Sequence, residues 1–211
     1  MLLPIDTLVL FFMTAVALGF APGPDNIFVL TQSALYGRLS GIVVTMGLCT
    51  GLIVHTLAVA LGVAVIFQTS EMAFTLMKTI GAVYLIYLAW GAWRAGVSEL
   101  PTGLSGQHGP SYKKLYLRGI VMNITNPKVA IFFMAFLPQF ADPSRGFLSY
   151  QLIELGLVFI LAGLAVFSSI AWSAGFLGAK LRKSPFMQQI MNRFASFIFV
   201  GLAVRLTLAE R

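Results

Sequence analysis

The sequence predicts an all-α integral membrane protein with six transmembrane helices, arranged as two inverted three-helix repeats. Three observations predict it: the composition, the length of the apolar segments, and a broken first helix in each half. Hydrophobic residues make up 58% of the 211 residues, and charged residues only 10%. Soluble domains carry about 25% charged residues, which keep their surface wetted. Most of the surface of this chain must therefore face lipid.

Six apolar segments are long enough to be membrane spans. A helix needs about 20 apolar residues to cross the hydrocarbon core of a bilayer, and charge, glycine or proline bounds each segment. The predicted spans are residues 5–36, 40–67, 73–94, 115–140, 148–178 and 187–208. Residues 95–114 are polar and rich in Pro, Gly and Ser, so we expect a loop there. The loop separates a first repeat, residues 1–94, from a second, residues 115–211.

The basic residues predict the orientation, because cytoplasmic loops are enriched in Lys and Arg. With the N-terminus outside, nine basic residues lie at or near the cytoplasmic face: Arg38, Arg94, Lys113, Lys114, Arg118, Lys180, Arg182, Lys183 and Arg193. Four fall outside, namely Lys78, Arg145, Arg205 and Arg211, and Lys128 stays within a span. This bias predicts that both termini lie outside the cytoplasm.

The composition argues against several other classes of protein. The net charge of +7 comes from basic residues between apolar runs, not from a soluble fold that would bind nucleic acid. The single Cys49 cannot form an intrachain disulfide and is expected to be a small packing residue. Residues 1–22 are similar to a signal peptide, but Asp6 stands where basic residues would be expected, so we predict that they remain as a span.

Helix-breaking residues interrupt the first span of each half, at Pro22-Gly23-Pro24 and at Asn126-Pro127. A straight helix over residues 5–36 would be about 48 Å long, well beyond the membrane core. Each break also has the sequence of a helix start, with proline in the first position after a capping Gly23 or Asn126. We therefore expect half-helices that begin within the membrane, where irregular backbone must be buried in protein or line a polar cavity. The alternative is two proline kinks that only shape the bundle.

Asp25 and Lys128 each directly follow a break proline. A charge within the membrane is costly and normally faces a cavity or a partner. One interpretation is a structural ion pair that ties the two halves together. The other is a central site, in which Asp25 receives a proton or an ammonium group, while Lys128 and the half-helix N-termini attract a carboxylate. The two interpretations are compatible, because a substrate could break the pair.

Other polar residues accompany these charges. Asn26, Asn123 and Asn126 add amide donors and acceptors around the breaks, and together with Gly23 they complete the predicted substrate site. Asn126 is expected to act first as a helix cap. No cofactor and no metal site are predicted.

His55 continues a stripe of small residues, Gly47 and Gly51, on the second span. Such a stripe lets another helix approach closely, so His55 is expected to point into the bundle. It is either a packing residue or, with Asp25, part of proton coupling, since a histidine pKa can lie near physiological pH. Stripes of this kind would also permit a homodimer.

These residues together resemble the LysE-type amino-acid exporters of bacteria, which include lysine and homoserine/threonine exporters. The matching features are Pro22-Gly23-Pro24, the stripe that leads to His55, the run from Gly81 to Leu88, and Asn123-x-x-Asn126-Pro127-Lys128 with the apolar run to Phe140. The resemblance covers nearly the whole chain. Many members have Asn where this chain has Asp25, so a proton-linked role for Asp25 does not follow from the family.

The resemblance implies a secondary transporter in the bacterial cytoplasmic (inner) membrane that exports amino acids or related zwitterionic metabolites, driven by proton antiport. The expected partners are the amino-acid substrate, protons and the bilayer, with no nucleic acid. A metal-ion exporter is the alternative function, but cations want several carboxylate, His or Cys ligands, and Lys128 would repel them. An enzyme is not expected, because the two His and seven acidic residues are scattered along the chain.

Overall fold

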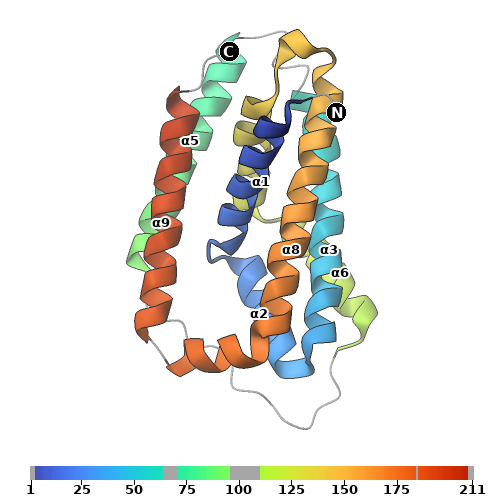
Figure 1. Ribbon diagram of the computed structural model, residues 1–211, viewed down its shortest axis with the longest axis vertical. Coiled ribbons are helices and arrows are strands. Elements are labelled where there is room, and N and C mark those ends of the chain that lie inside the picture. The colour runs from blue at the N-terminus through green and yellow to red at the C-terminus, as the bar shows by residue number, and fades with distance from the viewer. Residues whose placement is uncertain (1–2, 64–70, 96–109, 184, 209–211) are drawn as a thin grey trace.

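The computed structural model describes residues 3–63, 71–95, 110–183 and 185–208, which form an elongated helical bundle with both termini at one end (Figure 1). The first half contains α1 (Ile5–Phe20), α2 (Pro24–Tyr36), α3 (Arg38–Ala58), the π-helix η1 (Val59–Val63) and α5 (Glu71–Arg94). The second half contains α6 (Tyr112–Ile124), α7 (Pro127–Ile131), the π-helix η2 (Phe132–Phe136), the 3₁₀-helices η3 (Leu137–Phe140) and η4 (Pro143–Arg145), α8 (Leu148–Lys183) and α9 (Pro185–Leu208).

The helices confirm an all-α membrane protein of up to six spans. Four helices are long and apolar enough to cross a membrane, and two more spans are bent pairs: α1 with α2, at 64°, and α6 with the segment Pro127–Phe140, at 49°. The fourth span begins earlier than predicted, at Tyr112, because the Ser111 side chain accepts a hydrogen bond from the Lys114 amide and caps the helix. Most of the predicted loop, residues 96–109, lies outside the described residues, as do residues 64–67 of the second predicted span.

Both breaks occur where the prolines and the capping residues predict them. α1 ends at Phe20, and the backbone of Ala21 and Gly23 is extended before α2 begins at Pro24. In the second half, the Asn126 side chain accepts a hydrogen bond from the Lys128 amide, which starts α7 at Pro127. The predicted half-helix starts are therefore confirmed.

Several large contacts between helices have a counterpart in the other half of the chain. α3 packs against the broken span of the second half through α6, and its counterpart α8 packs against the broken span of the first half through α1 and α2. Two further large contacts, of α5 with α9 and of α3 with α8, join counterparts. The contact of α2 with α3 has no counterpart of similar extent in the second half, so the contacts follow an exchange of the halves only in part, and the inverted repeat stays a prediction.

Glycines bring α3 and α6 unusually close. A Cβ atom on Gly47 would overlap the Tyr116 carbonyl oxygen, and one on Gly119 would lie 2.6 Å from the Val44 carbonyl oxygen. Both obstacles are backbone atoms, so they could move only if the two helices separated. The small-residue stripe thus works as a helix-packing surface.

We expect Gly47→Ala to destabilise the protein by about 1–3 kcal/mol, the usual cost of overpacking a close contact. The measurement is the thermal unfolding midpoint of the purified protein in detergent. Gly201→Ala is the matched control, because a Cβ there meets nothing within 4 Å in another membrane-spanning helix. An equal loss of stability in both variants would contradict this account of the α3–α6 contact.

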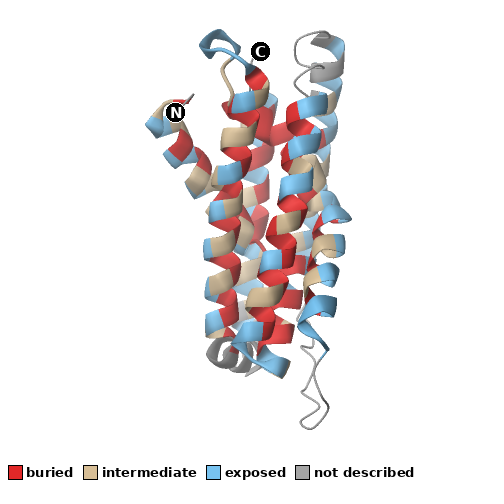
Figure 2. Cartoon of the chain, turned by 90° about the vertical axis from the view of Figure 1, so that its right-hand side faces the viewer, coloured by how far each residue is buried: buried red, intermediate tan, exposed pale blue. Residues whose placement is uncertain are grey.

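The outer surface of the bundle is apolar, as a lipid-facing surface must be. In Figure 2, exposed residues follow the outward faces of the long helices and buried residues the inward faces. Many large apolar side chains are exposed, among them Met72 at 81% and Phe147 at 77%. A charged loop caps one end of the bundle, where hydrogen bonds from the Ser144 side chain and amide, and the nearby Arg145, hold the pKa of Asp142 below its usual range.

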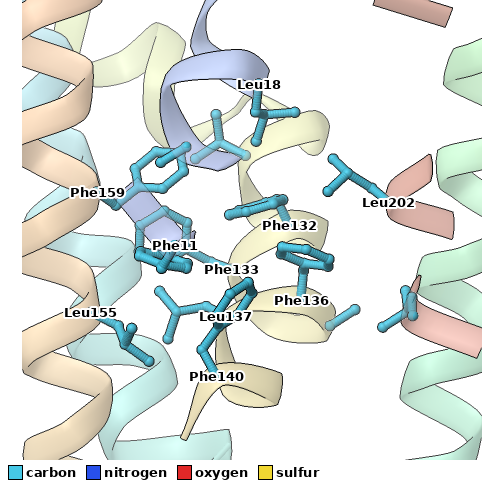
Figure 3. Packing of buried hydrophobic residues seen from close by; sticks show 14 of the residues in the cluster. Phe11, Leu18, Phe132, Phe133, Phe136, Leu137, Phe140, Leu155, Phe159 and Leu202 are labelled. Carbon is cyan, nitrogen blue, oxygen red and sulfur yellow. The ribbon is translucent and has the colours of Figure 1, made fainter. Parts of the chain in front are cut away.

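An aromatic plug fills the half of the bundle that carries the termini. We use this name for Phe11, Phe132, Phe133, Phe136, Phe140 and Phe159, which are all buried. Figure 3 shows these rings converging from α1, η2, η3 and α8. The Phe11 and Phe140 ring centroids are 4.8 Å apart, and those of Phe133 and Phe159 are 5.0 Å apart. These rings form the apolar core of that half, and the Arg205 guanidinium group packs on the plug, 3.9 Å from the centroid of the Phe140 ring.

Candidate functional site

The two helix breaks meet inside the bundle, although about a hundred residues separate them. The Lys128 ammonium group donates a hydrogen bond to the Ala21 carbonyl oxygen over 3.2 Å. The absence of a side chain at Gly23 makes room for it, since a Cβ there would lie 3.0 Å from Lys128 Nζ. The carboxyl end of α1 is the negative end of its dipole, so a cation is favoured at this position. Lys128 thus joins the break of one half to the break of the other.

Two asparagines use one end of their amide group to close the breaks. Asn26 Nδ2 donates to the Gly19 carbonyl oxygen over 2.6 Å, and Asn126 Oδ1 accepts from the Lys128 amide over 3.0 Å. These bonds identify the oxygen and the nitrogen of each side-chain amide group. Asn26 Oδ1, an acceptor, and Asn126 Nδ2, a donor, are buried and have no partner among the described residues. Since nearly all buried polar atoms in proteins are hydrogen-bonded, this pair of atoms has unused hydrogen-bonding capacity at the breaks; the Asn126 side chain also interacts with the Asp25 carboxyl group.

A cavity of about 1040 Å³ opens beside the breaks. Gly23, Asn26, Asn126 and Lys128 line it, and the remaining walls come from α2, α5, α6, α8 and α9. The lining residues of α5 run from Tyr84 to its end and those of α9 start near its beginning. The cavity therefore occupies the half of the bundle opposite the termini, and the aromatic plug packs the other half.

Asp25, Asn123 and His55 form a buried chain of hydrogen bonds behind this cavity and are not among its lining residues. Asp25 is 2% exposed and Asn123 is 1% exposed. Asn123 Nδ2 donates to Asp25 Oδ2 over 3.4 Å, and His55 Nε2 lies 3.1 Å from the Asn123 carbonyl oxygen. Because a carbonyl only accepts, His55 must carry its proton on Nε2. Asp25 Oδ1 is buried and has no partner among the described residues.

Gly51 explains how Asn123 fits between His55 and Asp25. A Cβ atom on Gly51 would lie 2.7 Å from both Asn123 Cβ and Asn123 Oδ1. Gly51 therefore makes room for the polar side chain of Asn123, whereas Gly47 makes room for the backbone of α6.

Asp25 and Lys128 do not form a direct ion pair. Within the described residues, the single ion pair with N and O atoms closer than 4.0 Å joins Arg145 to Asp142 on the surface. Lys128 lines the cavity, whereas Asp25 is buried beside it, close enough for the two charges to interact without a direct ion pair. The predicted site residues thus divide into a cavity group (Gly23, Asn26, Asn126 and Lys128) and the buried chain (Asp25, Asn123 and His55).

The comparisons with known proteins agree with this architecture. The LysE type translocator family matches residues 16–210. The chain belongs to this family. A homoserine/homoserine lactone efflux protein of Salmonella typhimurium is 34% identical over 193 residues, which cover 90% of this chain and 92% of that protein. An uncharacterized membrane protein of Vibrio cholerae is 32% identical over 200 residues, covering 95% of this chain and 96% of that protein. No solved structure matches the chain.

This LysE-type translocator is therefore a multi-pass membrane transport protein of the amino-acid exporter type. In the part of the chain that the structure describes, no group of three or more His, Cys, Asp or Glu side chains could hold a metal ion. The metal-ion alternative finds no support in the family or in its named relatives. The translocator carries its candidate site where helices are broken, as secondary transporters do.

Several cavity residues of the translocator were not predicted from the sequence. They are Gln32, Tyr84, Tyr87, Arg118, Ser173 and Asn192. The sequence did mark Arg118 as unusual, because it is a charged residue at the edge of an apolar span. It was interpreted only as evidence for the orientation of the chain in the membrane. The others are single polar residues in apolar helices, where no pattern marks the face that lines a cavity.

Proposed function

We propose that this translocator is a secondary exporter of small zwitterionic amino acids, which binds its substrate in the cavity from the cytoplasmic side. The observation that carries the proposal is that residues of both helix breaks line one cavity. Lys128 is a cation for a carboxylate there, and the unpartnered donor Asn126 Nδ2 and acceptor Asn26 Oδ1 lie buried directly behind the wall, where a small movement of the breaks would bring them to a carboxylate and an ammonium group. A free amino acid carries both groups. The named efflux function of the Salmonella relatives makes homoserine the first substrate to test.

We also propose that the half of the bundle that holds the cavity faces the cytoplasm and that both termini lie outside. The bias of Lys and Arg supports this orientation, since Arg94, Lys113 and Lys114 lie in the same half as the cavity. The aromatic plug would then be the closed outer gate. Export requires the plug to open after the cytoplasmic end has closed over the substrate.

Proton antiport is the proposed energy source, and the buried chain Asp25–Asn123–His55 is its proposed carrier. Asp25 lies next in sequence to Asn26, which faces the cavity, so a proton on Asp25 can alter the site without competing for the same space. Loss of the Asp25 charge would also remove the nearest negative charge that balances Lys128. Substrate affinity would then depend on the protonation of Asp25, as coupling requires.

Efflux from proteoliposomes that contain the purified chain tests this function. Homoserine is loaded inside the proteoliposomes at neutral pH, and the outside medium is then made acidic. We expect homoserine to leave at least about ten times faster than from protein-free liposomes loaded in the same way. A protonophore should abolish the acceleration. If neither homoserine nor a panel of other amino acids left faster than from protein-free liposomes, the exporter assignment would be wrong. Efflux at the same rate with and without a pH gradient would contradict only the proposed proton coupling.

A homodimer remains a prediction, and neither transport nor coupling as proposed here depends on it.

A further inference from the structure

The charged side chains that line the cavity in the described part of the chain are all positive. Two cations, Arg118 and Lys128, line it, and no acidic residue is among the described residues that do. The acid nearest to it, Asp25, is buried behind the wall. The other acids whose side chains the structure describes lie in the half that carries the termini: Asp6 opens α1, Glu154 accepts a hydrogen bond from the Leu3 amide, and Asp142 caps η4. The wall of the cavity is therefore positive.

Arg118 is held in a defined position at this wall. Its guanidinium group lies 4.8 Å from the centroid of the Phe28 ring on α2, and both residues line the cavity. This cation–π contact fixes the group against an apolar surface and uses none of its five N–H donors. No carboxylate among the described residues lies within 4.0 Å of it. The donors of Arg118 thus remain available to a carboxylate in the cavity.

Arg118 and Lys128 stand at two depths of the same cavity. Arg118 is exposed and lies farther from the half that carries the termini, whereas Lys128 is partly buried at the break. Ten positions of helix separate them, which corresponds to about 10–15 Å when the break is allowed for. The cavity therefore presents two successive cations to a carboxylate. A second ammonium group on the same molecule would be repelled at both positions, because nothing acidic on the described wall would hold it.

We propose that Arg118 is a specificity-determining residue that, together with Lys128, rejects molecules with a net positive charge. The proposal rests on the exporter function above and narrows its substrate class. Most of the remaining wall is apolar, with Phe20, Leu30, Met122 and Phe199 among its residues. The class is therefore a small metabolite without net positive charge, whose side chain can be apolar.

A mixture experiment tests the charge requirement. Proteoliposomes with the full chain are loaded with equal amounts of homoserine, leucine, leucinamide and lysine, and the released compounds are quantified by mass spectrometry. Leucinamide keeps the side chain and ammonium group of leucine but lacks its carboxylate. We expect homoserine or leucine to leave at least about ten times faster than lysine and leucinamide, the effect of one uncompensated like charge. Release of lysine or leucinamide as fast as the faster zwitterion would overturn this inference and leave the exporter function standing. No release of any of the four would overturn both.

Variants test the part played by Arg118. We expect Arg118→Gln to raise the half-saturation concentration for the transported zwitterion about three- to ten-fold and to reduce the discrimination against lysine. Arg118→Lys keeps the charge and should retain most of that discrimination, which separates loss of charge from loss of folding. Arg38→Gln is the matched control, because the Arg38 guanidinium also rests on a ring, 4.5 Å from the centroid of Trp172, but lies outside the cavity. Unchanged half-saturation and discrimination in Arg118→Gln would overturn the assignment.

Discussion

Replacing Lys128 with glutamine is expected to abolish export. The maximal efflux rate divided by the half-saturation concentration should fall at least about 100-fold. The ammonium group is the cationic donor at the point where the two breaks meet, and among the described residues it donates one hydrogen bond, to the Ala21 carbonyl oxygen. An ammonium has three donors, so two remain for a substrate carboxylate. Hydrogen bonds to charged groups contribute about 1.5–3 kcal/mol each, and every 1.4 kcal/mol is ten-fold.

The measurement is initial efflux from proteoliposomes over a range of internal substrate concentrations. The glutamine amide can still donate to the Ala21 carbonyl oxygen, so we expect the thermal unfolding midpoint to change little. Lys114→Gln serves as the control, because Lys114 is exposed in the first turn of α6 and does not line the cavity. If Lys128→Gln folded normally and transported at the wild-type rate, the carboxylate site would have to lie elsewhere.

Asp25→Asn is expected to separate transport from its driving force. Asparagine has the same shape, and its carbonyl oxygen can accept the hydrogen bond from Asn123 Nδ2 that Asp25 Oδ2 now accepts. It cannot take up a proton. Exchange of substrate for substrate across the membrane, which needs no net proton movement, should stay within about three-fold of wild type, whereas the acceleration of efflux by a pH gradient should fall at least about ten-fold.

Two assays on the same proteoliposomes check this: counterflow at equal pH on both sides, and efflux into an acidic medium. Asp6→Asn is the matched control, since Asp6 is exposed in the first turn of α1. A wild-type response of Asp25→Asn to the pH gradient would remove Asp25 from proton coupling. Loss of counterflow together with gradient-driven efflux would instead assign Asp25 a role in the substrate site itself.

The two variants report on the two groups into which the structure divides the predicted site. Asp25 and Asn26 are neighbours in sequence, but consecutive side chains point about 100° apart around a helix. Asn26 therefore lines the cavity, while Asp25 is turned into the packed interior towards Asn123. Lys128 could have been paired with Asp25 as far as its sequence position shows. The structure places its ammonium group on the carbonyl end of α1 instead.

The sequence by itself determined the membrane class, the spans and the two breaks. These features depend on local properties: the length of an apolar run, the charges at its ends, and the missing N–H of Pro22, Pro24 and Pro127. The close packing of α3 was also predictable, because Gly47 and Gly51 lie on one helix face.

Only the tertiary structure decided which polar residues share the cavity and which lie behind its wall. In a soluble helix the apolar stripe shows which face is buried, but lipid and protein interior are equally apolar, so the sequence of a membrane helix carries little record of its rotation. Arg118, Tyr84 and Asn192 could not be assigned to the cavity for that reason. The aromatic plug likewise depends on packing between α1, η2, η3 and α8, segments that are distant in the chain.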